Sequence, residues 1–94
     1  MLLDDWFLDI GFSFRVAIRE IYTILPMNVN TVKELYLKYR DEDKLYRATR
    51  GRRAKSLILL NNGWCFTSYL SPDELNERIW ESRRVEKAQR YAKE

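Results

Sequence analysis

The turn sequence Asn62-Gly63 constrains the fold of this chain more than any other short segment. It separates the apolar run SLILL at 56–60 from the aromatic and β-branched run WCFTSYL at 64–70. Asn-Gly between two such runs is a strong short-range signal for an antiparallel hairpin. Residues 57–60 are apolar at every position, which is typical of a central strand covered on both faces. The sequence therefore predicts a hairpin whose first strand needs a second neighbour on its other side.

The segment KLYRATR at 44–50 is the nearest candidate for that neighbour. As a strand it would complete a three-stranded antiparallel meander, and this is the interpretation that we favour. As a helix it would give the order helix, helix, helix, hairpin, helix. That alternative has a winged-helix-like layout, with the arginines on the reading helix and Asn62-Gly63 at the tip of the wing.

The first quarter of the chain has the apolar periodicity of an amphipathic helix. Seven apolar residues alternate spacings of four and three, which predicts a helix over 3–24 with one apolar side. Pro26 would end it, and acidic residues near its start suit the helix dipole. The acidic residues are Asp4, Asp5 and Asp9, and the apolar positions are Leu3, Phe7, Ile10, Phe14, Ala17, Ile21 and Ile24.

Two further helices are predicted from capping residues. Asn30 is a candidate cap for a helix over 31–40. SPDE at 71–74 combines a serine cap, a proline in the first helical position and acidic residues in the first turn. We expect the last ten residues to form a solvated helix or to fray. The fold class expected is α+β in a single compact domain over 1–94: two N-terminal helices, a small antiparallel meander or hairpin, and a C-terminal helix.

The absence of histidine excludes most catalytic sites. Among 94 residues there is no histidine and one cysteine, Cys65, so neither a Ser-His-Asp triad nor a Cys-His pair can form. Zinc would have one thiolate ligand at most. The acidic run Asp41, Glu42 and Asp43 lacks the spacing of a calcium-binding loop. We expect a protein that is not an enzyme and that needs no cofactor and no metal.

Composition indicates a soluble protein of a reducing compartment. The chain is 46% hydrophobic, enough for a core, and its single cysteine cannot form a disulfide within a monomer. The acidic start is unlike a secretory signal. No apolar run approaches the roughly 20 residues of a membrane span. We expect a cytoplasmic protein with no membrane partner.

Positive charge is concentrated in the middle third of the chain. Five of the nine positions in 47–55 are basic, and four of these five are arginine, whose fork of donors suits phosphate. Crowded like charges are relieved by a polyanion, and nearby aromatic rings can stack on bases. The predicted nucleic-acid site comprises Lys44, Tyr46, Arg47, Arg50, Arg52, Arg53, Lys55 and Trp64.

Alternatives to this site remain open at this point. The cluster could instead dock on an acidic protein surface, or form a solvated turn partly neutralised by the acidic run at 41–43. A second apolar stripe on the first predicted helix, Leu8, Phe12 and Val16, is either covered by another helix or forms a self-association or partner surface. Trp80 and the final helix are the alternative partner surface. A homodimer is one such arrangement.

The sequence thus predicts a small non-enzymatic nucleic-acid-binding or regulatory module that binds DNA or RNA through its arginine-rich turn. The second hypothesis is a protein-binding adaptor or inhibitor. A phage or mobile-element product that docks on a host nucleic-acid-processing complex would be one example.

Overall fold

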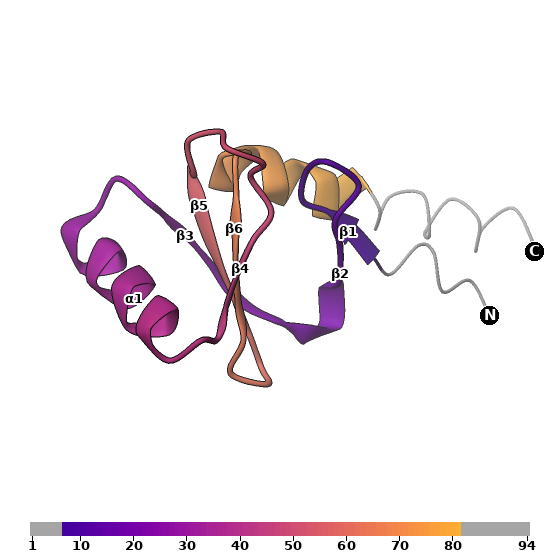
Figure 1. The fold of residues 1–94 in the computed structure, drawn as a ribbon. Helices are drawn as coiled ribbons and strands as arrows, with labels where there is room; N and C mark the ends of the chain where they lie inside the picture. The colour runs from indigo at the N-terminus through magenta and orange to yellow at the C-terminus, as the bar shows by residue number, and fades with distance from the viewer. Residues whose placement is uncertain (1–6, 82–94) are drawn as a thin grey trace, which may run out of the picture.

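A computed structural model describes residues 7–81 of the chain, and Figure 1 shows its arrangement. The predictions on Leu3, Asp4, Asp5 and the last ten residues lie outside this range. The described elements, in chain order, are β1 (Phe7–Asp9), β2 (Arg15–Ala17), a 3-10 turn (Ile18–Glu20), β3 (Ile21–Pro26), α1 (Asn30–Asp41), β4 (Leu45–Arg47), β5 (Ser56–Leu60), β6 (Cys65–Ser68) and a helix over 72–81.

A four-stranded sheet in the order β3-β5-β6-β4 forms the centre of the molecule, and β1 and β2 form a separate two-stranded sheet. The pairs β3–β5 and β5–β6 are antiparallel. β4 and β6 run parallel, with Leu45 opposite Cys65 and Arg47 opposite Thr67. The predicted α+β class is confirmed, but the order of elements within it differs.

The predicted hairpin is confirmed, and β5 is central as expected. The Leu60 amide donates to the Trp64 carbonyl oxygen at 2.9 Å, and Gly63 adopts a φ of 88° in the turn. The prediction of a three-stranded antiparallel meander is wrong. Residues 45–47 do form a strand, which excludes the winged-helix-like layout, but β4 lies beside β6, and the second neighbour of β5 is β3.

The prediction of an N-terminal helix over 3–24 is wrong for all of its described residues. Residues 7–26 form β1, β2, the 3-10 turn and β3. The chain reverses at Gly11 with a φ of 115°, and Phe12 and Ser13 follow with φ values of 53° and 65°. A helix cannot contain such residues. Leu8 and Ile10 are both buried with Asp9 between them, which is the two-residue period of a strand.

Both remaining helices form where expected, with one change of cap. α1 exceeds the predicted helix by one residue at each end, but Val29 occupies the cap position and Asn30 is already helical. At 71–74 the predicted serine cap is present. The Glu74 amide donates to Ser71 Oγ at 3.2 Å, and the Ser71 hydroxyl donates to the Glu74 carboxylate at 3.3 Å.

Each face of the sheet has its own core. α1 covers one face, where Val32 packs with the strand residues Leu57, Leu59 and Cys65. The β1–β2 hairpin and the 72–81 helix cover the opposite face, where Leu8, Ile10, Val16 and Leu75 pack around Ile58. In Figure 1, α1 and the β1–β2 hairpin lie on opposite sides of the four-stranded sheet.

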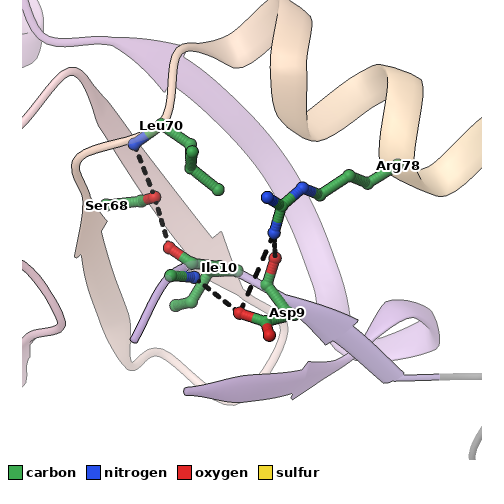
Figure 2. Close-up of polar contacts among 6 residues, drawn as sticks. Asp9, Ile10, Ser68, Leu70 and Arg78 are labelled. Atoms are coloured by element: carbon green, nitrogen blue, oxygen red, sulfur yellow. Dashed lines mark hydrogen bonds and ion pairs between the residues drawn. The ribbon is translucent and has the colours of Figure 1, made fainter. Parts of the chain in front are cut away.

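Polar contacts join the hairpin, the end of β6 and the 72–81 helix (Figure 2). The buried Ser68 hydroxyl donates to the Ile10 carbonyl oxygen at 2.6 Å and accepts from the Leu70 amide at 3.1 Å. Arg78 donates to the Asp9 carbonyl oxygen at 2.8 Å, and Asp9 Oδ1 accepts from the Gly11 amide at 2.8 Å. These bonds fix the hairpin against the end of the sheet from which the arginine-rich segment leaves.

None of the helices within 7–81 is long and apolar enough to cross a bilayer.

Candidate nucleic-acid interface

The arginine-rich segment is the connection from β4 to β5, and it passes over the end of β6. We call residues 47–55 the arginine loop. Its two ends are bound to β6: the Ala48 amide donates to the Thr67 carbonyl oxygen at 3.2 Å, and the Lys55 amide donates to that of Ser68 at 2.8 Å. Because β6 lies between β4 and β5 in the sheet, the chain must cross the end of β6 to reach β5. The topology therefore displays the loop at one end of the sheet.

Three arginines of the loop lie against aromatic rings. The Arg47 guanidinium carbon is 6.0 Å from the centroid of the Tyr36 ring. Those of Arg50 and Arg52 are 5.7 Å from Phe12 and 5.2 Å from Tyr69, respectively. Such contacts hold a guanidinium in place without neutralising its charge. Phe12 and Tyr69 also contact each other, with ring centroids 5.0 Å apart. The hairpin and the segment after β6 thus form an aromatic support for the loop.

The cations of the loop form no ion pair with a carboxylate of residues 7–81. Across residues 7–81, the ion pairs are Arg40 with Asp41 at 3.3 Å and Arg78 with Asp9 at 3.9 Å, and neither includes a residue of the loop. The acidic run at 41–43 therefore does not fold back to neutralise the cluster. Asp41, the first residue of that run, forms its ion pair with Arg40, the preceding residue of α1.

Two cavities flank the loop on the side of α1. The first, which we call the arginine cavity, has a volume of about 400 Å³ and is lined by Tyr36, Arg47, Thr49, Arg50, Gly51, Arg52, Ala54 and Thr67. The second, the lysine cavity, has a volume of about 550 Å³ and is lined by Pro26, Met27, Asn28, Lys33, Tyr36, Arg53, Ala54, Lys55, Ser71 and Pro72. They share Tyr36 and Ala54, and no carboxylate of residues 7–81 lines either one. The two cavities form adjoining basic hollows.

The structure brings five of the eight predicted nucleic-acid residues together around these hollows. The five are the four arginines of the loop and Lys55. The other three lie elsewhere. Lys44 and Trp64 sit at the opposite end of the sheet, where the Lys44 carbonyl oxygen accepts from the Cys65 amide. Tyr46 packs with Phe14 and Phe66 on the sheet face away from α1.

The predicted partner surface is divided by the fold. Leu8 and Val16 oppose each other across the β1–β2 ladder and are 2% and 5% exposed, so they belong to the core and are not available on the surface. Phe12 at the hairpin tip and Trp80 on the 72–81 helix remain exposed. A role for these two in self-association or in binding a protein stays a prediction.

Among the cavity-lining residues that sequence reasoning did not assign to the site are Lys33, Tyr36, Thr49 and Thr67. Lys33 and Tyr36 are three positions apart on α1, and the helical period places them on one side. Their proximity to the loop depends on where α1 packs. Thr67 lies opposite Arg47 only because β4 pairs with β6. Local sequence patterns carry no signal for that pairing.

Comparison with known proteins shows which family the sequence of this chain matches. The model of the RemA-like family, described as Extracellular matrix regulatory protein A-like, matches residues 7–79, which include the whole arginine loop. A protein of Leptospira biflexa is 33% identical over 72 residues, which cover 77% of each chain. One of Finegoldia magna is 30% identical over 79 residues, covering 84% of this chain and 95% of its own.

A protein of Coprothermobacter proteolyticus is 29% identical over 79 residues, covering 84% of this chain and 75% of its own. All three relatives carry the name "Putative regulatory protein". The family match extends from β1 into the 72–81 helix, so it includes every labelled element described above. The chain therefore belongs to the RemA-like family.

Proposed function

We propose that this protein is a small, non-enzymatic regulator that binds nucleic acid through the arginine loop. The observation that supports this most is the state of the loop's five cations. They are gathered over the end of β6, form no ion pair with any residue in 7–81, and border two hollows without a carboxylate. Concentrated charge with no internal partner favours a polyanion.

The shape of the site supports a backbone contact. Guanidinium groups bind phosphate oxygens through paired hydrogen bonds, and Arg47, Arg50 and Arg52 are held over aromatic rings. A preorganised side chain loses less conformational entropy on binding. The loop therefore suits successive phosphates along a strand, and such contacts position a protein on nucleic acid. The regulatory names of the relatives agree with a protein of this kind.

Replacing Arg50, Arg52 and Arg53 by alanine tests this proposal. Three lost phosphate contacts should weaken binding to mixed-sequence duplex DNA or RNA at least a hundredfold at about 100 mM salt. A mobility shift or fluorescence anisotropy titration measures the affinity.

The matched control replaces Arg15, Lys38 and Lys44 by alanine. These cations are exposed and line neither cavity, so the control removes the same net charge from other parts of the surface. The affinity of this control for the duplex should fall by less than about tenfold, because a distant charge acts on the nucleic acid only through the screened electrostatic field. Equal losses in both variants, or undiminished binding by the loop variant, would contradict the proposal. Loop-dependent binding to an acidic protein alone would support the docking alternative instead.

A further inference from the structure

The lining of the arginine cavity includes a hydroxyl group that has no hydrogen-bond partner among the described residues. Thr67 is 1% exposed, and its Oγ1 is buried without a hydrogen bond to any residue in the described part of the chain. Thr67 lines the arginine cavity. A buried hydroxyl that gives up water without gaining a partner destabilises the fold. An oxygen acceptor bound in the cavity would remove that cost.

The rim of the same cavity is positively charged. Arg47, Arg50 and Arg52 line it, and no acidic side chain of the described residues does so. All three guanidinium groups lie against rings, and within 7–81 none is paired with a carboxylate. The lining of the cavity thus combines positively charged side chains with a hydroxyl donor that has no partner within 7–81, and both features suit an anion with several oxygen acceptors.

The size of the cavity indicates how much ligand it accepts. Its volume of about 400 Å³ falls in the range of small-molecule sites and exceeds that of a single water or halide ion. Phosphate has acceptor oxygens enough for the three arginines and the threonine together. A phosphate ester leaves its organic part free to extend toward the lysine cavity, which adjoins at Tyr36 and Ala54.

We propose that the arginine cavity is a binding subsite for one phosphate group of a nucleotide, with the Thr67 hydroxyl donating to a phosphate oxygen and Arg47, Arg50 and Arg52 supplying the charge. The inference deepens the proposed function and rests on it where the phosphate belongs to a bound polynucleotide. A free nucleotide offers the same chemistry, and the experiment separates the two sources.

The test replaces Thr67 by valine, which keeps the shape and removes the hydroxyl. Inorganic phosphate serves as the probe, titrated at constant ionic strength while the amide NMR signals of Thr67 and Gly51 are followed. We expect saturable shifts in the wild type and an affinity about tenfold lower in Thr67→Val, because a hydrogen bond to a charged group is lost. Thr67→Ser, which keeps the hydroxyl, should restore binding. Thr23→Val, a strand threonine outside both cavities, should bind as the wild type does.

Folding of the variant is checked by its thermal midpoint. Because the Thr67 hydroxyl has no hydrogen-bond partner within 7–81, valine should leave the midpoint unchanged or raise it. Binding of a mixed-sequence duplex by Thr67→Val then identifies the source. A parallel loss of duplex affinity assigns the phosphate to the strand, and unchanged duplex affinity with lost phosphate binding assigns it to a free nucleotide. Both outcomes support the subsite.

Two results would overturn the inference: no saturable shift at Thr67 in the wild type, or phosphate bound equally well by Thr67→Val. Neither result touches the proposed function, which depends on the arginine triple variant and its duplex affinity. Conversely, duplex binding that is insensitive to the arginines would end the proposed function while leaving phosphate binding in the cavity measurable.

Discussion

At Arg50 the backbone adopts a φ of 47°, a conformation that costs a residue with a side chain on the order of 1 kcal/mol. Gly51 follows with a φ of 83°, where glycine is unstrained. The two residues turn the loop back over β6, and the Arg52 amide closes the turn on the Thr49 carbonyl oxygen at 2.9 Å.

Cys65 behaves as a core residue. It is fully buried beneath α1, and burial raises the pKa of its thiol from 9.0 to about 12. At pH 8 the folded chain therefore has about a thousandfold less thiolate than the unfolded chain, and the thiolate is the reactive form. We expect labelling of Cys65 by a disulfide reagent to be at least a hundredfold slower in buffer than in denaturing urea.

The raised pKa of Cys65 also makes the free energy of unfolding depend on pH in the alkaline range. The folded state holds the thiol proton more tightly than the unfolded state, so the contribution of this thiol to the free energy of unfolding is complete below pH 9.0 and is lost as pH rises toward about 12. Because Cys65 is the only cysteine in the sequence, the labelling signal has one source. Equal labelling rates in buffer and in urea would show that the thiol is not buried.

Among the elements, the β1–β2 hairpin links the core to the site. Its turn carries Phe12, which contacts Tyr69 and lies under Arg50, and Tyr69 in turn lies under Arg52. Gly11 makes this approach possible. A Cβ at Gly11 would overlap Cε1 of the Tyr69 ring, and its φ of 115° is unfavourable for any other residue. The hairpin turn and the aromatic support depend on each other.

Gly11→Ala is therefore expected to lower the free energy of unfolding by about 2–3 kcal/mol, from backbone strain plus the clash with Tyr69. Gly63→Ala is the matched control. Gly63 also has a positive φ, of 88°, but a Cβ there meets nothing within 4 Å, so the control carries the strain alone. Urea denaturation measures both variants. Equal losses would show that Gly11 and Tyr69 do not approach as described.

The elements that could be predicted from the sequence are those with local signals. The Asn62-Gly63 turn and the Ser71 cap each determine their structure within a few residues, and both are present. The prediction of a helix over 3–24 was wrong because the apolar residues of this segment also fit the helical spacing of four and three. The decisive signals were Gly11 and the β-branched residues that follow it, which favour strands.

The whole molecule explains why only part of the site could be predicted. The cluster of arginines is contiguous in sequence, so composition alone located it. The two cavities join that cluster to α1, β6 and the segment after it, and this contact depends on the order β3-β5-β6-β4. Parallel pairing of β4 with β6 has no local signature, because it is set by packing between segments about 20 residues apart.

The same architecture makes the loop a stable platform. Cores on both faces of the sheet hold β5 and β6 in place, and the loop is bound to β6 at both ends. If the loop binds nucleic acid as proposed, charges held on such a platform meet the phosphates at fixed spacing. The number of phosphates neutralised would then be a property of the fold, and it can be read from the salt dependence of binding.

The most direct measurement is the affinity for a mixed-sequence DNA duplex as a function of salt, for the wild type and for the variant with Arg50, Arg52 and Arg53 replaced by alanine. If each of the loop's five cations neutralises one phosphate, the slope of log K against log salt should be about −4.5 for the wild type and about −1.8 for the variant. Equal slopes for the two proteins would contradict the account, because the arginine loop would then not contact the backbone.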